Sequence, residues 1–367
     1  MNSHCIYSGL LCGMALLLLA CDKTIHQYPG PEEPEQPTET VVLIELNVDR
    51  TPPYYYKELN YDNQGGYVEA SLEPGIAEEY IPDERLSLRL ITELYQVSSS
   101  LERIATEKLI ERREITVDRL KQAPQDTLQF HVPPGTYRAL TWADYVPTRN
   151  QTDWHFETPS LDAIRVKVDH KPQVNHHTSS GAGSCNFSID LDNQGNSLPR
   201  LLDETRAEPD NTTVVPVYLE RASGRFKLWA TDLQDFLKSG HHIENLRIKI
   251  IYKQYVSAGY NVDTQAPNHF VQMNTMETTP TTLPGNGSVL LAYDYVLTSS
   301  DQENHVLVDI FIYEGDQELN HYQDVTIPLQ RNRETVVKGP FLTKKIGSGD
   351  IGIEDDFDDE IVVVIPD

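Results

Sequence analysis

The sequence predicts an all-β protein built from β-sandwiches. Short runs rich in β-branched and aromatic residues recur at close spacing along most of the chain, and turn-forming residues separate them. Helix signals are sparse, and the strands do not alternate with helical segments as they would in a parallel α/β sheet. At 367 residues, the chain is long enough for two domains with a sizeable core each.

Regular structure is predicted to begin at Val41–Val48, a β-rich run whose second half alternates apolar and polar residues. The tight turn Pro133-Pro134-Gly135 separates two later strands, because proline fixes φ and glycine permits positive φ. The predicted strands after the first are 67–72, 86–95, 114–118, 127–132, 136–145, 186–191, 214–219, 225–230, 245–256, 289–297, 306–313, 323–329, 334–338 and 361–365.

Three segments are less regular. Asp232–Lys238, closed by Gly240, has the acidic start, basic end and glycine stop of a short helix. Ser98–Arg113 is compatible with a helix or with a charged loop leading into a strand. The alternation of Asn245–Val256 slips around residues 249–252, which suggests a bulge.

The start of the chain has the pattern of a bacterial lipoprotein signal. Fifteen apolar-rich residues from Ile6 suit the apolar region of a secretion signal, and the small Ala20 precedes Cys21. Cleavage between Ala20 and Cys21 would leave Cys21 as an acylated N-terminus, and its long acyl chains would anchor the protein durably in a membrane. The positive start usual for such signals is missing, and an ordinary signal peptide with an incidental cysteine is the alternative.

Composition excludes several partners. The formal net charge of −26 argues against nucleic-acid binding and against electrostatic adhesion to anionic lipid, which leaves acyl chains as the membrane attachment. Once the signal is removed and Cys21 is acylated, Cys185 is the remaining cysteine, so no intrachain disulfide is expected. Residues 29–39 are acidic and proline-rich and should form an extended tether.

No motif predicts catalysis, and we expect neither an enzyme nor a cofactor. His176-His177 and His241-His242 lack the spacing that brings two imidazoles to one metal ion, and the acidic segment Asp350–Glu360 lacks the spacing of a calcium loop. The tyrosines Tyr54-Tyr55-Tyr56 could stack on sugars or cover the edge of a sandwich.

The C-terminus is a dense β-former. Five apolar residues would suit a strand that is covered on both faces. Either this segment is the last strand of its own sandwich, or it completes the sheet of a neighbouring subunit as a donor strand. The five residues are Ile361, Val362, Val363, Val364 and Ile365.

Several segments together resemble the fimbrillin-like anchor subunits of Bacteroidales fimbriae, the type V pilus anchoring family. The stretch after Cys21, the hairpin segment Pro134–Val146 with its Trp-Ala-Asp-Tyr motif, and Ile327–Gly339 with its Arg-Asn-x-x-Thr motif are similar to segments of that family in order and position. The resemblance extends over most of the mature chain.

The resemblance implies two tandem transthyretin-like β-sandwiches at the base of a surface fimbrium on the outer membrane, with a fimbrillin shaft subunit as the partner. Shaft and tip subunits of that system lose their first strand to an Arg-specific protease, whereas an anchor keeps it. Because Val41–Val48 precedes Arg50, we expect Arg50 to escape efficient cleavage in the assembled protein. Ile361–Ile365 would then enter the groove of the lowest shaft subunit.

The predicted organisation is a signal peptide at 1–20, a tether at 21–40, an N-terminal sandwich at 41–200 and a C-terminal sandwich at 201–367, with a possible donor strand at 360–367. Two other functions stay open. One is a surface glycan-binding lipoprotein whose first contacts would be Tyr54, Tyr55, Tyr56 and Trp154. The other is a fimbrial tip adhesin of the same family.

Overall fold

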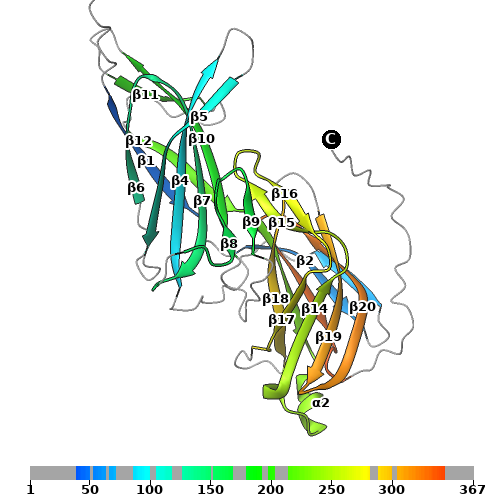
Figure 1. Cartoon of the computed structure of the whole chain (residues 1–367). Coiled ribbons are helices and arrows are strands. Elements are labelled where there is room, and N and C mark those ends of the chain that lie inside the picture. Colours follow the sequence, from blue (N-terminus) through cyan, green and yellow to red (C-terminus); the bar gives the residue numbers. More distant parts are fainter. Residues whose placement is uncertain are drawn as a thin grey trace, which may run out of the picture. The chain divides into compact units, whose positions relative to one another are not determined.

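The computed structural model describes a protein whose regular structure is almost entirely β-strand (Figure 1). The chain divides into two compact units, Met1–Glu39 and Thr40–Asp367, and every described strand lies in the second. The described residues are 39–49, 53–62, 66–71, 86–99, 105–117, 126–149, 152–167, 179–191, 197–202, 214–281, 288–299 and 304–343.

An eight-stranded sheet has the strand order β5-β4-β7-β10-β12-β1-β6, with β11 paired to β10. The first strand of the chain therefore lies inside this sheet, between β12 and β6. Its strands are β1 (Thr40–Val48), β4 (Leu86–Ser99), β5 (Ala105–Val117), β6 (Asp126–Val132), β7 (Gly135–Pro147), β10 (Gly181–Leu191), β11 (Ser197–Leu201) and β12 (Val214–Arg221).

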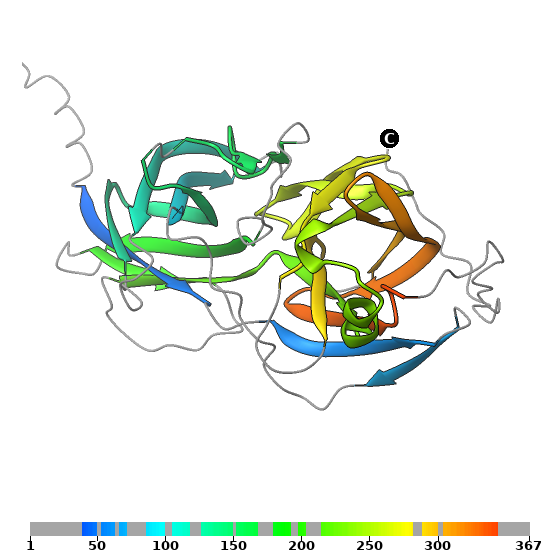
Figure 2. The ribbon, with the colours of Figure 1, turned by 90° about the horizontal axis from the view of Figure 1, so that it is seen from below.

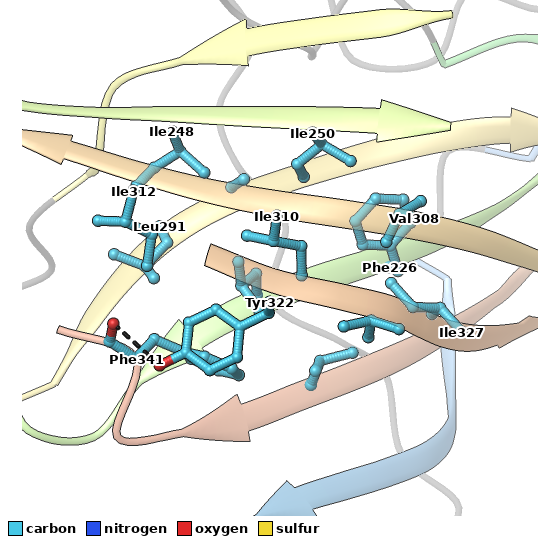
Figure 3. Packing of buried hydrophobic residues seen from close by; sticks show 14 of the residues in the cluster. Phe226, Ile248, Ile250, Leu291, Val308, Ile310, Ile312, Tyr322, Ile327 and Phe341 are labelled. Carbon is cyan, nitrogen blue, oxygen red and sulfur yellow. Dashed lines mark hydrogen bonds between the residues drawn. The ribbon is translucent and has the colours of Figure 1, made fainter. Parts of the chain in front are cut away.

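A five-stranded sheet has the order β18-β13-β21-β2-β3, and a four-stranded sheet has the order β17-β14-β19-β20. Buried aliphatic and aromatic side chains from both sheets form one core, with Phe226 and Ile310 among its members (Figure 3). The strands are β2 (Tyr54–Tyr61), β3 (Tyr67–Ser71), β13 (Ser223–Ala230), β14 (Leu246–Tyr252), β17 (Thr275–Thr278), β18 (Val289–Leu297), β19 (Asn304–Glu314), β20 (Gln317–Leu329) and β21 (Arg333–Gly339).

A second four-stranded sheet has the order β16-β15-β9-β8. It consists of β8 (Phe156–Glu157), β9 (Ile164–Val166), β15 (Val256–Asn261) and β16 (Ala266–Val271), so it brings together strands that lie about ninety residues apart in the chain. A separate apolar cluster contains Phe156 and Ile164 of this sheet together with Trp142 of β7 and Leu297 of β18.

Consecutive strands do not always share a sheet. β1 lies in the eight-stranded sheet, whereas β2, which follows it in the chain, pairs with β21 in the five-stranded sheet (Figure 2). β12 follows residue 201 and pairs in parallel with β1. The division into two sandwich domains with a boundary between residues 200 and 201 stays a prediction.

The all-β prediction is confirmed, and so is the short helix. α2 spans Leu233–Lys238, buries Leu233 and Phe236, and is followed by Gly240 at a φ of 84°, a value that glycine adopts without strain. A 3-10 turn, η2 (Ile243–Asn245), precedes β14.

The helix interpretation of Ser98–Arg113 is wrong, and the loop interpretation is wrong for residues 98–99 and 105–113, which are strand; residues 100–104 lie outside the described residues. β5 begins at Ala105 and pairs with β4 along its length as the edge strand of the eight-stranded sheet. An edge strand can carry many charged side chains because part of its surface faces water. The predicted bulge at residues 249–252 is also wrong, since β14 alternates buried and half-buried residues without a register shift.

Candidate functional site

The first strand fills a groove in the eight-stranded sheet. β1 pairs in parallel with β12 and antiparallel with β6, so Ile44 lies opposite Val215 on one side and Leu128 on the other. Val42, Ile44 and Leu46 are 0%, 0% and 1% exposed. Their spacing of two places all three on the core face of the sheet.

The apolar side chains of β1 account for much of its attachment. Full burial of a valine, isoleucine or leucine side chain contributes about 1.5–3 kcal/mol each. Val42 lies opposite the fully buried Phe130, and Leu46 lies opposite the fully buried Val217. Because β1 occupies this position with its own residues, the sheet has no vacancy for a foreign strand between β12 and β6.

The chain leaves the eight-stranded sheet directly after β1. The backbone N–H of Asp49 donates to the carbonyl of Leu219 at 3.0 Å, and β2 begins at Tyr54 in the other sheet. Arg50 lies between these strands, outside the described residues. A cut at Arg50 would therefore leave β1 attached by hydrogen bonds and side-chain packing alone.

The Trp-Ala-Asp-Tyr motif lies in β7. Two of its residues are on the face of the eight-stranded sheet opposite the core that contains Val42, Ile44 and Leu46. Trp142 is 0% exposed, and its ring lies 5.2 Å from that of Phe156 and 5.7 Å from that of Tyr260. Asp144 points to the same face, because it lies two residues further along the strand. The motif thus combines an aromatic side chain that contacts β8 and β15 of another sheet with a buried carboxylate.

Arg89 of β4 neutralises this carboxylate. Arg89 and Asp144 lie opposite one another in the β4–β7 pair and are 2% and 1% exposed. The guanidinium Nε donates to Oδ1 of Asp144 at 2.8 Å and NH2 donates to Oδ2 at 2.6 Å, a two-pronged geometry. NH1 donates to Oδ1 of Asp153 at 2.7 Å.

At both Asp144 and Asp153, burial acts to raise the pKa of the carboxylate and the hydrogen bonds from Arg89 act to lower it. Burial raises the pKa of Asp144, although hydrogen bonds from Arg89 oppose the shift. Burial also acts to raise the pKa of Asp153, but hydrogen bonds from Arg89 and Thr158 outweigh it and the net pKa is lowered. The hydrogen bonds that Arg89 donates to both carboxylates raise its pKa despite its burial, so the guanidinium stays charged.

The Arg-Asn-x-x-Thr motif forms the turn between β20 and β21. Asn332 has a φ of 55°, a left-handed conformation that asparagine tolerates better than most residues. Arg331 is 7% exposed, and its Nε donates to the carbonyl of Arg221 at 2.8 Å. The hydroxyl of Thr335 donates to the carbonyl of Pro328. The motif therefore fixes the turn that carries the chain from the four-stranded sheet of β20 to the five-stranded sheet of β21, and it ties this turn to the end of β12.

The predicted aromatic contacts belong to different parts of the fold. Tyr54, Tyr55 and Tyr56 lie in β2, and Nζ of Lys227 lies 5.4 Å from the centre of the Tyr55 ring. Trp154 lies between β7 and β8 and is half-buried.

Histidine and acidic side chains form no metal centre in the part of the chain that the structure describes. Nδ1 of His241 lies 2.7 Å from Oε2 of Glu314, and the backbone N–H of His242 donates to Oε1 of the same carboxylate at 2.8 Å. Hydrogen bonds from His242 and His241 lower the pKa of Glu314. His176-His177 lies outside the described residues.

The predicted lipidation and donor-strand residues also lie outside the described residues. These are Ala20, Cys21, Ile361, Val362, Val363, Val364 and Ile365, and the acidic segment 350–360 lies there too. No helix in the described part of the chain combines the length and the apolar character that crossing a membrane requires.

Sequence reasoning missed two buried charge clusters. One contains Arg89, and the other joins Arg225, Glu334 and Lys227 in the five-stranded sheet. The available signal was an arginine or lysine flanked by apolar residues in a predicted strand, as in Leu88-Arg89-Leu90. Because charged residues are rarely buried without a partner, such a position predicts a carboxylate nearby.

Residues 48–366 match a family of unknown function, DUF6562. The chain belongs to the DUF6562 family. No curated protein is similar to the chain in sequence.

Several solved structures are similar to this DUF6562 member. The fimbrial anchor protein Mfa2 from Porphyromonas gingivalis has 11% identity and a TM-score of 0.32, over 77% of this chain and 82% of that one. A candidate adhesin from Bacteroides thetaiotaomicron has 10% identity and a TM-score of 0.38, over 80% and 95%. A candidate polysaccharide-binding protein from the same species has 8% identity and a TM-score of 0.36, over 73% and 80%. These values describe similarity and decide no function.

Proposed function

We propose that this DUF6562 protein is a surface lipoprotein that anchors the base of a fimbrium to the outer membrane. Acylated Cys21 would hold the membrane, residues 21–40 would set the distance from it, and two tandem sandwiches would form the body. Ile361–Ile365 would join the lowest shaft subunit by strand complementation, in which backbone hydrogen bonds give affinity and alternate side chains fill pockets.

The occupied groove of β1 is the observation that carries this proposal. A subunit that accepts a strand needs an open groove in its sheet, but here β1 pairs on both edges and buries Val42, Ile44 and Leu46. As long as Arg50 stays uncut and β1 stays in place, such a subunit would donate a strand without accepting one at this position, and it would end a polymer. The lipoprotein signal at Ala20-Cys21 supports placing that end at the membrane.

Deletion of residues 360–367 tests the proposal. We expect cells to release fimbriae into the medium while the truncated protein still reaches the outer membrane folded, as measured by fractionation and limited proteolysis. Val363→Asp should also release fimbriae, because it introduces a charge into a strand that must enter an apolar groove. Asp358→Asn, which changes the preceding acidic segment, is the matched control and should retain them.

The opposite result is equally specific. If the deletion unfolds the protein and prevents its export, residues 361–365 form a strand of their own core. If fimbriae stay attached to cells that carry the folded deletion variant, another part of the chain holds the shaft.

A further inference from the structure

A pocket lies above the buried Arg89–Asp144 pair. It is on the face of the eight-stranded sheet that points away from the core containing Val42, Ile44 and Leu46. Its volume is about 420 Å³, within the range of about 300–1,000 Å³ that is usual for small-molecule sites. The pocket is wide open to solvent. The side chains at its wall include Arg89, Arg112, Glu114, Asp153 and Lys167.

The polar groups of this pocket are held in place by one another. Asp153 accepts from Arg89 at 2.7 Å, from the backbone N–H of Thr158 at 3.1 Å and from its hydroxyl at 2.9 Å. Arg112 donates to Glu93 at 2.6 Å and to the carbonyl of Thr158 at 2.6 Å. A ligand would therefore meet groups that lose little conformational freedom on binding.

Two groups keep hydrogen-bonding capacity for a ligand. Oε1 of Glu114 lies 3.8 Å from NH1 of Arg89, longer than a hydrogen bond, and the glutamate side chain is 37% exposed. Nζ of Lys167 donates to the carbonyl of Asp153 at 3.0 Å, and an ammonium carries three donors in all. The pocket thus offers both an acceptor and a donor among its lining side chains.

We infer that this pocket binds one neutral sugar residue. A hydroxyl donates and accepts through the same oxygen, so the several hydroxyls of a sugar match a pocket that carries both a carboxylate acceptor and an ammonium donor. The three cations of the wall are offset by the carboxylates of Glu114 and Asp153, and Asp144 and Glu93 lie behind Arg89 and Arg112, so no strong excess of one charge selects an ion. The open side leaves room for the rest of a glycan chain.

Saturation-transfer NMR with the full mature chain tests the inference. The probes are methyl glucoside, methyl galactoside and methyl mannoside, with methyl glucuronide and inorganic phosphate as charged comparisons. A methyl hexoside has about a dozen non-hydrogen atoms, so the ligand efficiency of ordinary small molecules gives a dissociation constant of about 1 mM. We expect at least one neutral hexoside to receive saturation and to bind more tightly than both charged probes.

Two variants locate the site. Glu114→Gln and Lys167→Ala should each weaken binding about tenfold, because each removes a charged hydrogen-bonding group. Glu111→Gln is the matched control. It makes the same change in the same strand at the same 37% exposure, but its carboxylate pairs with Arg113 and not with the pocket, so binding should stay within about twofold.

Three outcomes would overturn the inference. One is the absence of transfer to any neutral hexoside at about 20 times the expected dissociation constant, the concentration at which a site is nearly full. Another is tighter binding of glucuronide or phosphate, which would make the site one for anions. The third is binding that Glu114→Gln and Lys167→Ala leave unchanged while both variants keep the wild-type melting temperature.

Discussion

The first two strands of the chain lie in different sheets, β1 in the eight-stranded sheet and β2 in the five-stranded sheet, and the two sheets hold them differently. β1 contributes Val42, Ile44 and Leu46 to a core and lies between two strands whose facing residues are apolar. β2 contributes Leu59 and Tyr61 to the other core and lies between β21 and β3.

Charges fix the register of β2. Nζ of Lys338 in β21 donates to Glu58 at 2.5 Å, and Nζ of Lys57 lies 3.2 Å from Glu69 in β3. A shift of β2 by one residue would separate both pairs as well as reverse its faces. The β1 groove instead recognises alternating aliphatic side chains. Of the two positions, the β1 groove is therefore the one whose fit depends on alternating aliphatic side chains and not on ion pairs.

The two sheets also differ in how deeply they bury charge. Arg89 of the eight-stranded sheet reaches an open pocket through Asp153, which is 33% exposed. Arg225 and Glu334 of the five-stranded sheet are both 0% exposed, and Lys227 lies 2.8 Å from the same glutamate. The first cluster can contact a ligand, whereas the second can only stabilise or destabilise the fold.

The largest expected effect is at the centre of β1. Ile44→Asp removes a fully buried aliphatic side chain and leaves a carboxylate among apolar neighbours. We expect a loss of at least about 4 kcal/mol in the free energy of unfolding, measured by urea denaturation. Val41→Asp is the matched control, because Val41 is 41% exposed in the same strand. Equal losses in the two variants would show that β1 is not held by its core face.

Breaking the closed charge cluster should cost nearly as much. Glu334→Gln leaves the buried Arg225 and Lys227 without their carboxylate, and removing one partner of a buried ion pair costs about 3–5 kcal/mol. Glu277→Gln is the control, because its pair with Arg247 is 35% and 40% exposed and should contribute about 0–1 kcal/mol. A loss below about 1 kcal/mol in the free energy of unfolding of Glu334→Gln would show that this buried cluster contributes no more to stability than the exposed Glu277–Arg247 pair.

The two regions should respond to pH in opposite directions. Burial raises the pKa of Asp294 in β18 to about 6, although hydrogen bonds from Tyr252 and the backbone N–H of Tyr295 oppose the shift. Its folded pKa exceeds the unfolded one, so stability is lost as pH rises through about 6, by up to about 3 kcal/mol. The lowered pKa of Asp153 instead contributes stability that is lost as pH falls.

Urea denaturation between about pH 2 and pH 8 checks this contrast. Asp294→Asn should flatten the fall in stability between about pH 4 and pH 6, whereas Asp153→Asn should reduce the loss under more acidic conditions. An unchanged pH profile in Asp294→Asn would mean that this carboxyl does not titrate near 6 in the folded protein.

The sequence located most of the long strands, but it missed β2, β8, β9, β11, β15, β16 and β17, and it revealed no strand partners. Alternation located β1 and the strands on either side of the Pro133–Gly135 turn, because the faces of a strand are a local property of the sequence. It could not reveal that β1 pairs with β12 or β2 with β21, since these contacts join distant segments. The prediction of a strand at 114–118 located the end of β5, but residues 105–113 were missed because this edge strand carries charges on faces that alternation treats as core.

The residues of the candidate sites also divide into those that a local motif reveals and those that only contacts between distant segments bring together. The Trp-Ala-Asp-Tyr motif identified Asp144 as part of a distinctive segment, but its partner Arg89 lies 55 residues away in the chain. The pocket depends on that pairing and on Asp153 and Lys167, which have no sequence pattern in common. The acylation and donor-strand residues were predicted from short local motifs and lie outside the described part of the chain.

The most direct test of the anchoring account is a photo-crosslinker at Val363 in the Cys21-acylated protein, taken from outer membranes and followed by mass spectrometry of the crosslinked partners. The account predicts crosslinks to one polymerising β-sandwich subunit, on chains that still carry β1. Crosslinks confined to the same chain, or partners bound to chains that begin at Thr51, would contradict it.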